Sequence, residues 1–524
     1  MLTEYLVIFV YLALLIAIGM VVKKFNADDS DYFRNGCKGT WWLVGASAFM
    51  VQFSAWTFTG AAGAAYEAGW SVMIIFLANA AGYLVAGVIF APWFRQLRVV
   101  TVPEAIRDRF GPATQQLYAW IFVVLGLAYA SLWLFGLSLF CSAVFGYKIE
   151  HVVIVIGLIV LVYSTVGGSW AVMATDFLQT LILIPITILM AFLCLQALGG
   201  FSGMFAAIEE AGLAEDYALV NESGRFTGKN TYTWVWAAAI FLAQIVKMNT
   251  VMASQRYYAV KTGLDARKAA LLAGLLMVMG SVIWFIPPIT GRILFEADVM
   301  GVLGMDENKR KEASYAVTSM NLLPAGMTGL MVVAMLSATM SSMDSGLNKN
   351  AAMLVRDIIP ALTRRLGYEW DTTKPRLLLA QVASFCFGVT IIGLTLYFVA
   401  QGGKGVFELM LDIGAMLALP MAVPMLLAML IRQAPAWSAI ASIIVGFTVS
   451  AIGFYSETFF GEQWAFATVV FANSAAATAG FLATVPFWTT ASEEYRQKVD
   501  VFFEAVVQNG TVARNPAVAA AELA

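Results

Sequence analysis

Charged residues are scarce in this sequence. Only 12% of its 524 residues are Asp, Glu, Lys or Arg, whereas 60% are hydrophobic, and the mean hydropathy is +0.79. A water-soluble domain of this length has about 25% charged residues. Most of the surface therefore does not face water, and lipid is the natural alternative. The net charge of −2 gives no electrostatic basis for a nucleic-acid partner.

Histidine and cysteine are scarce as well. Because His151 is the one histidine, multi-histidine metal sites are excluded, and we interpret it as a residue at the end of a span. The sequence has no HExxH motif and no Asp-rich metal cluster, so we predict that the protein is not an enzyme. Four cysteines match neither CxxC nor zinc spacing and predict no disulfide framework: Cys37, Cys141, Cys194 and Cys386.

Long apolar runs take the place of the missing charge. A membrane-spanning helix needs about 20 apolar residues, and the continuous rather than alternating runs exclude a β-barrel. The first run lacks the basic start and the cleavage site of a signal peptide, so we expect it to remain as a span. Thirteen candidate spans lie near residues 4–22, 42–66, 70–93, 116–146, 151–165, 171–199, 233–254, 269–293, 323–354, 377–400, 406–431, 437–456 and 464–488.

The pattern predicts an all-α polytopic membrane protein. A single transmembrane domain would cover residues 1–488 and a cytoplasmic tail residues 489–524, with long polar outside loops near 200–232 and 294–322. With the N-terminus outside, the cytoplasmic segments hold 21 Lys and Arg residues and the outside loops hold 8. Positive charge accumulates on the cytoplasmic side. We therefore expect a plasma (inner) membrane protein with its N-terminus outside and its C-terminus in the cytoplasm.

The second candidate span carries polar residues at mid-depth. Gln52, Ser54 and Thr57 lie close to Gly60 and Gly63 in an otherwise apolar run. Backbone unwinds within a bilayer only where it lines a protein cavity, and transporters build ion and solute sites in this way. Helix packing through small residues is the alternative, and the span alone favours neither.

The ninth candidate span carries a second polar cluster. Ser341, Ser342, Asp344 and Ser345 offer the hard oxygen ligands that small hard cations prefer. Ser341, Asp344 and Ser345 share one helix face through their i, i+3, i+4 spacing. A carboxylate inside the membrane is costly and indicates function. Alternatively, Asp344 lies at the cytoplasmic helix end and pairs with a basic residue there.

Three further spans hold polar residues. Asp176 and Gln179 lie in the sixth span, Gln244 and Lys247 in the seventh, and Asp412 in the eleventh. A lysine inside the membrane needs a counter-charge, which Asp412 or a carboxylate of the solute could supply. The alternative is that Lys247 extends its ammonium toward an interface.

These residues resemble the sodium/solute symporter family, which includes sodium-coupled sugar, proline, pantothenate and sialic acid carriers. The resemblance extends from about residue 5 to residue 455. Its motifs appear in the family's order and are Asp31-Tyr32-Phe33, Trp42-Leu43-Val44-Gly45, Phe53-Ser54-Ala55, the stretch from Tyr163 through Gly167-Gly168 to Thr175-Asp176 and Gln179, Gln255-Arg256, and Ser341-Ser342.

The resemblance implies a five-plus-five inverted-repeat core of the leucine-transporter type, in which the first helix of each repeat is broken. The repeats would lie at about 42–199 and about 233–456, with one extra helix at the N-terminus and two at the C-terminus. The resemblance also implies sodium-coupled symport of a small polar organic solute by alternating access, in a protein that functions as a monomer. Sodium would be the coupling ion.

The resemblance also implies site residues. The main sodium site would use the carbonyl groups of Met50, Phe53 and Ala338 and the hydroxyl groups of Ser341 and Ser342. A second sodium site would add Asp176, Asp344 and Ser345. Since two-sodium members have a hydroxyl at the position of Asp344, the sodium stoichiometry stays open. The residues expected to bind solute are Gln52, Ser54, Trp56, Thr57, Gln244, Lys247 and Asp412.

The sequence leaves open more than one class of solute and more than one coupling ion. Trp56 suits stacking on a sugar ring, whereas Lys247 suits the carboxylate of an amino acid, a sialic acid or another organic acid. We favour a sugar or related polyol. Proton coupling through Asp176, Asp344 and Asp412 is the first rival. A solute sensor is the second, for which the 36-residue tail offers no room for a signalling module.

Overall fold

The protein is described here by a computed structural model. It describes residues 2–22, 39–97, 99, 102–166, 169–226, 229–368, 377–401 and 404–507. The motif Asp31-Tyr32-Phe33, the Gly167-Gly168 pair and Cys37 lie outside the described residues. At some helical positions only the backbone is described, and Asp176, Asp344 and Ser345 are among them.

Helices make up the described part of the chain, and each of the thirteen predicted spans contains one. The helices in these ranges are α1 (Leu2–Val22), α3 (Trp41–Gln52) with α4 (Ala55–Phe58) and α5 (Gly60–Ala68), α6 (Met73–Val85) with η4 (Ala86–Phe90) and α7 (Ala91–Leu97), α9 (Pro112–Phe145), α10 (Ile149–Val166), α11 (Ser169–Ala197), α13 (Trp234–Met248) with η5 (Val251–Ala259), α14 (Gly263–Trp284) with α15 (Ile286–Leu294), α19 (Met327–Met353), α21 (Leu377–Gln401), α22 (Val406–Ile413) with η7 (Gly414–Ala418) and α23 (Leu419–Leu430), α24 (Ser438–Phe454), and α26 (Phe466–Leu482).

Shorter helices connect these elements. They are η3 (Gly69–Val72), α8 (Val102–Phe110), α12 (Gly200–Glu210), α16 (Glu296–Met300), α17 (Glu307–Glu312), α18 (Ser314–Leu322), η6 (Leu354–Ile358) with α20 (Ile359–Arg365), α25 (Ser456–Phe460), η8 (Val485–Thr490) and α27 (Glu493–Val507).

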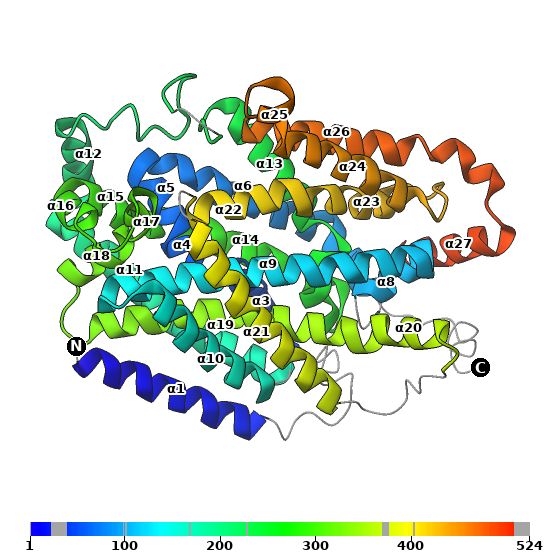
Figure 1. Ribbon diagram of the computed structural model, residues 1–524, viewed down its shortest axis with the longest axis horizontal. Coiled ribbons are helices and arrows are strands. Elements are labelled where there is room, and N and C mark those ends of the chain that lie inside the picture. Colours follow the sequence, from blue (N-terminus) through cyan, green and yellow to red (C-terminus); the bar gives the residue numbers. More distant parts are fainter. Residues whose placement is uncertain are drawn as a thin grey trace.

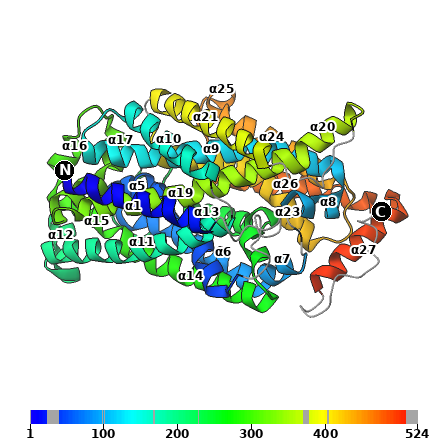
Figure 2. The same ribbon diagram turned by 90° about the horizontal axis from the view of Figure 1, so that it is seen from below.

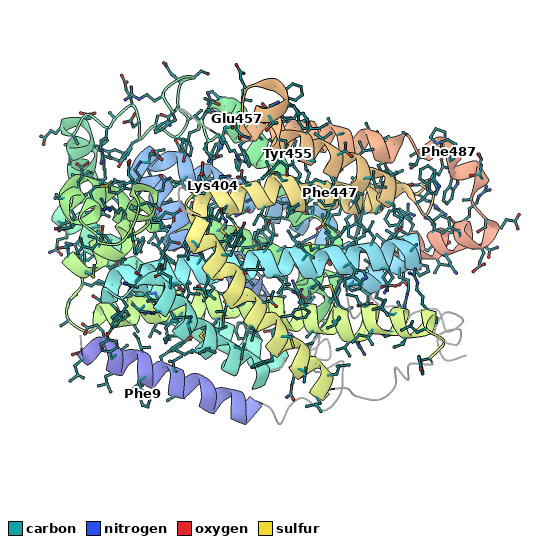
Figure 3. The ribbon with its side chains drawn as sticks, in the orientation of Figure 1. Phe9, Lys404, Phe447, Tyr455, Glu457 and Phe487 are labelled. Carbon is teal, nitrogen blue, oxygen red and sulfur yellow. The ribbon has the colours of Figure 1, made fainter. Side chains whose placement is uncertain are left out.

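The outer surface of the helical bundle is strongly apolar. By length and hydropathy, seven described helices could cross a membrane, or eight if a bent pair is one span, and five shorter apolar helices accompany them. Figure 3 shows Phe9 projecting away from the bundle, and its side chain is 69% exposed. Exposed apolar surface on this scale fits lipid rather than water. The number of thirteen spans stays a prediction.

Two of the predicted spans are broken within their length. In the second span, α3 ends at Gln52 and α4 begins at Ala55, because Phe53 and Ser54 are extended. In the seventh, α13 and η5 meet at an angle of 51°. The expectation that the first helix of each repeat is broken is therefore confirmed as far as the two breaks are concerned. The inverted symmetry between them stays a prediction.

Helical connections lie at both ends of the bundle. Figure 1 shows α12 and α15–α18 at the end where the N-terminus lies, and α8, α20 and α27 at the opposite end. Figure 2 shows the same separation from below. The segments near 200–232 and 294–322, expected as polar loops, thus contain short helices. Their apolar side chains, such as Met204, Ile208 and Val299, are buried against the bundle.

The tail segment packs against the bundle through α27. The hydroxyl of Tyr495 donates to the backbone carbonyls of Arg109 and Ala434, each at 3.1 Å. The side chain of Arg109 is buried and donates to the Ala428 and Ile431 carbonyls, at 3.2 and 2.8 Å. These carbonyls belong to the end of α23, where helices leave acceptors unpaired. The first part of the predicted tail is therefore ordered on the helices that precede it.

Candidate functional site

The break between α3 and α4 exposes backbone groups that a continuous helix would pair. Phe53 and Ser54 are both extended, and the Phe53 N–H donates back to the Met50 carbonyl at 3.1 Å. The Ser54 hydroxyl accepts the Trp56 N–H at 3.3 Å, so serine acts as the N-cap of α4. Two extended residues thus leave the Phe53 carbonyl without a helical partner in the protein interior.

Hydroxyl groups of α19 face this break. The Ser342 hydroxyl donates to the Phe53 carbonyl at 3.3 Å. Thr339 accepts the Ala55 N–H at 3.1 Å, which ties the first turn of α4 to α19. The Ser341 hydroxyl is buried and has no hydrogen-bond partner among the described residues. A buried hydroxyl without a partner needs an explanation, and a bound ion is one.

The structure brings the five predicted ligands of the main sodium site to one buried region. Met50, Phe53, Ala338, Ser341 and Ser342 are each at most 2% exposed. Phe53 and Ser342 are in direct contact, and the Met50 carbonyl lies next to the break. Ala338 and Ser342 are four residues apart on α19 and so share a face. The donor set consists of hard oxygens, which fits a small hard cation.

The second predicted sodium site falls largely outside the described side chains. The backbone of Asp176 lies in α11, and the backbones of Asp344 and Ser345 lie in α19. The two helices pack against each other. Neither the pairing of Asp344 with a basic residue nor its role as a ligand is tested by this arrangement.

Aromatic rings surround Trp56 on the far side of the break. The Trp56 ring stacks on Phe407 of α22, with centroids 5.9 Å apart and planes at 4°, and on Phe76 of α6 at 6.1 Å. The Trp56 Nε1 and the Thr57 hydroxyl are buried without a partner in the described part of the chain. Gln52 is exposed and Gln244 is partly buried. The region therefore combines packed aromatic rings with unpaired polar groups.

Lys247 lies on α13, two residues before the second break. Its ammonium approaches Gly414, where a Cβ atom would come within 3.3 Å of Nζ and within 3.6 Å of the Tyr129 hydroxyl. Gly414 begins the π-helical segment η7 between α22 and α23. Such segments occur frequently at functional sites. The lysine thus faces the eleventh predicted span, and whether its ammonium lies at the level of an interface stays open.

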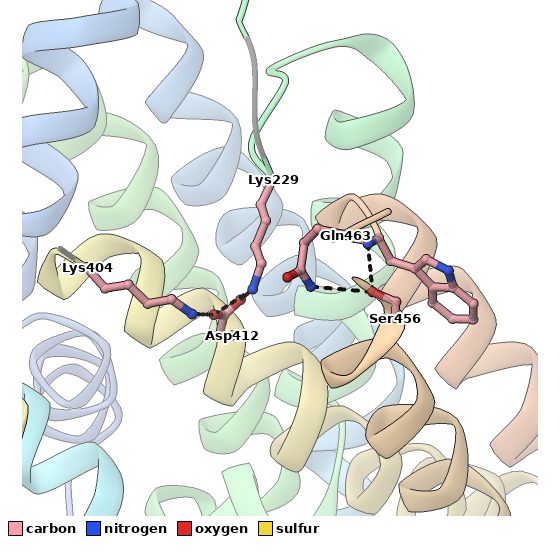
Figure 4. Close-up of polar contacts among 6 residues, drawn as sticks. Lys229, Lys404, Asp412, Ser456 and Gln463 are labelled. Carbon is pink, nitrogen blue, oxygen red and sulfur yellow. Dashed lines mark hydrogen bonds and ion pairs between the residues drawn. The ribbon is translucent and has the colours of Figure 1, made fainter. Parts of the chain in front are cut away.

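Asp412 has other partners than the sequence suggested. Its carboxylate forms ion pairs with Lys229 and Lys404, each at 3.0 Å (Figure 4). Lys229 comes from the segment before α13, and its carbonyl accepts the Phe466 N–H of α26 at 3.1 Å. The carboxylate therefore links two connections to α22. Asp412 as the counter-charge of Lys247, one of the two alternatives, is not what the structure shows.

Several contacts at this site escaped sequence reasoning. Thr339 belongs to the polar stretch of the ninth span, and its spacing of three residues from Ser342 could have identified it. Phe407, Lys229 and Glu312 carry no such signal, because their contacts join segments far apart in the chain. Glu312 of α17 accepts the Phe407 N–H at 2.9 Å and so connects an outer helix to the ring that stacks on Trp56.

Comparison with known proteins identifies the family. A sequence model described as the Sodium:solute symporter family matches residues 32–446. The chain belongs to this family. The sodium/glucose cotransporter 2 of Rattus norvegicus is 26% identical over 505 residues, covering 87% of this chain and 72% of that protein. The sodium/sialic acid symporter NanT of Aliivibrio fischeri is 21% identical over 450 residues, covering 84% and 85%.

A solved structure shares the fold. It is the substrate-bound, outward-open state of a Na⁺-coupled sialic acid symporter, with a TM-score of 0.78 and 20% sequence identity over 93% of this chain and 98% of that chain. Membership in the family makes the protein a sodium-coupled solute transporter and not an enzyme, with sodium as the coupling ion. The resemblance drawn from the sequence motifs is confirmed.

Proposed function

We propose that the protein carries a sugar or related polyol across the plasma membrane by alternating access, together with sodium bound between the α3–α4 break and α19. The observation that carries this proposal is the buried, unpartnered Ser341 hydroxyl beside the contact between Ser342 and the Phe53 carbonyl. Hydroxyls and carbonyls freed by a broken helix are how transporters of this kind hold sodium.

A sodium ion bound at this contact would exchange its water ligands for oxygen atoms of the protein. The proposed ligands are the carbonyls of Met50, Phe53 and Ala338 and the hydroxyls of Ser341 and Ser342. An ion here bridges the broken helix and α19, so its binding favours one arrangement of the two elements. We keep Asp176, Asp344 and Ser345 as the candidates for a second sodium or for a proton.

The solute would lie beside the break. Trp56 offers an aromatic face, and the polar groups of Gln52, Ser54, Thr57 and Gln244 suit hydroxyl groups of a sugar. Relatives named as glucose, myo-inositol and sialic acid carriers support this class of solute. Asp412, which the sequence also suggested, is paired with two lysines, and we propose that it holds their two connections against α22.

The coupling between sodium and solute follows from the broken helix that both proposed sites share. The same broken helix carries sodium ligands and solute contacts, so sodium binding changes the affinity for solute, and linkage makes the effect reciprocal. The membrane potential drives sodium inward with about 2.3 kcal/mol per charge per 100 mV. Rocking of the bundle would then open the site to the cytoplasm, where a low sodium concentration favours release.

The proposed topology has thirteen spans, an outside N-terminus, a cytoplasmic C-terminus and a five-plus-five inverted repeat, in a monomer. In a variant whose native cysteines are replaced, Glu457→Cys should react with a membrane-impermeant maleimide in intact cells. Glu493→Cys of α27 should react only after permeabilisation. The reverse pattern would invert the topology.

A screen of purified protein tests the function. Thermal shifts would be measured with sugars, polyols, amino acids and organic acids, each in sodium chloride and in choline chloride. We expect stabilisation by a sugar or polyol that requires sodium. Uptake of that solute into proteoliposomes should then need an inward sodium gradient. Equal accumulation with and without sodium, or uptake that follows a pH gradient instead, would contradict the proposal.

A further inference from the structure

Lys247 presents a positive charge inside the membrane domain. It lies near the end of α13, within the seventh predicted span, and is partly buried. Its ammonium approaches Gly414, which begins η7 within the eleventh predicted span. A charge at such depth is costly, and proteins retain it where it pairs with an opposite charge.

The described residues provide no such partner. No ion pair in the described part of the chain includes Lys247. Asp412, two residues before Gly414, is occupied by Lys229 and Lys404. A bound anion would supply the counter-charge that Lys247 lacks among these residues.

Lys247 and Tyr129 both approach the backbone at Gly414. A Cβ atom on this residue would meet Lys247 Nζ at 3.3 Å and the Tyr129 hydroxyl at 3.6 Å. Because glycine has no side chain, both donors lie close to the same stretch of η7. Tyr129 belongs to α9, which packs against both α4 and α22. Its ring stacks on Trp133, with centroids 6.2 Å apart, which fixes the direction of the hydroxyl.

We propose that Lys247 and Tyr129 bind the carboxylate of the solute, so that the protein carries a sugar acid, a monosaccharide with one carboxylate, in preference to the neutral sugar. The inference rests on the proposed function, because it narrows the class of sugar that the same site accepts. The lysine ammonium and the tyrosine hydroxyl each donate one hydrogen bond to the carboxylate. A charge-assisted bond of this kind is about twice as strong as a neutral one.

Matched pairs of acid and neutral sugar test the inference. Purified full-length protein would be titrated with glucuronate, glucose, galacturonate and galactose in sodium and in choline buffers, with thermal shift as the readout. We expect sodium-dependent stabilisation by an acid at concentrations at least tenfold lower than by its neutral counterpart. Lys247→Gln should weaken the acid at least 30-fold and remove the preference, while the shift produced by sodium alone is retained.

Two further variants separate binding from structure. Tyr129→Phe should weaken the acid about fivefold and leave the neutral sugar unchanged. Lys498→Gln, which removes a lysine of α27 that is paired with Glu494, should leave the acid preference intact. If Lys247→Gln weakens acid and neutral sugar equally, Lys247 pairs with a group of the protein and the inference is wrong.

The remaining outcomes separate this inference from the proposed function. Sodium-dependent binding of the neutral sugars alone would overturn the carboxylate and leave sugar transport standing. The neutral sugars would also be tested in sodium chloride and in sodium methanesulfonate. If glucose binds only in the chloride buffer, the Lys247 ammonium binds an inorganic anion, and the inference is overturned. No sodium-dependent shift with these four compounds or with any sugar or polyol of the wider screen would contradict the proposed function itself.

Discussion

The hydroxyl of Ser342 donates to the carbonyl of Phe53 at 3.3 Å, across the gap between α19 and the broken helix. The two residues are separated by 289 positions in the chain. A donor to a freed carbonyl stabilises the break when no ion is bound, and the same two oxygens would turn toward a sodium ion when it binds. The contact therefore links the proposed binding of sodium to the geometry of the broken helix.

Ser342→Ala removes one of these oxygens. Loss of one ligand should cost about 1–2 kcal/mol of sodium binding, which corresponds to roughly a 5- to 30-fold higher sodium concentration for half-maximal stabilisation. Sodium titration of the thermal shift measures this. Ser337→Ala is the matched control, because its hydroxyl is buried on the same helix and donates to Tyr11 instead. Equal sodium dependence in the two variants would make Ser342 a structural residue.

Trp56→Ala removes the ring that stacks on Phe407. If the indole face holds the solute, the dissociation constant of the solute should rise about tenfold, since aromatic contacts of this kind contribute about 0.5–1.5 kcal/mol beyond buried area. The sodium requirement in the absence of solute should not change. Trp70→Ala, which removes a ring that packs against Phe205 of α12, should leave solute affinity unchanged. A solute affinity equal to that of the unmodified protein would place the solute elsewhere.

The two ion pairs of Asp412 should contribute unequally to stability, because Lys229 is more buried than Lys404. Lys229 and Asp412 are 15% and 17% exposed, whereas Lys404 is 45% exposed. An exposed ion pair contributes little, typically below about 1 kcal/mol, and a buried one is costly to break. A double-mutant cycle of Lys229→Met and Asp412→Asn on thermal stability should give a coupling of about 1–2 kcal/mol. The cycle with Lys404→Met should give about 0.5 kcal/mol or less, and equal couplings would contradict the burial argument.

Sequence predicted the elements better than their contacts. Each of the thirteen apolar runs contains a helix, but the glycines and polar residues of the second span did not decide whether it is broken, and only the family resemblance implied the break found at Phe53 and Ser54. The contact between Phe53 and Ser342 was expected only from the family motifs, because no local pattern shows which helices face each other. The partners of Asp412 could not be predicted, since Lys229 and Lys404 belong to connections whose path depends on tertiary packing.

Glu312 of α17 is a buried carboxylate outside the spans. It is 4% exposed, one oxygen accepts the Phe407 N–H at 2.9 Å, and the other has no partner among the described residues. Glycine at position 405 lets the carboxylate approach the start of α22 closely. Burial raises the pKa of Glu312 from its usual 4.5 to about 7. The protonated form is therefore the one that the folded state favours.

Glu312→Gln should flatten the pH dependence of stability. Below pH 4.5 the carboxyl is protonated in both folded and unfolded chains, and between pH 4.5 and 7 only the folded state keeps the proton. Stability should therefore fall as pH rises through this window, by on the order of 2–3 kcal/mol, and level off above pH 7. Thermal unfolding of the purified protein from pH 4.5 to 8 measures the slope. Glu307→Gln on the same helix, an exposed residue that pairs with Lys311, should retain the fall between pH 5 and 7. A Glu312→Gln profile as steep as that of the unmodified protein would show that another group carries the dependence.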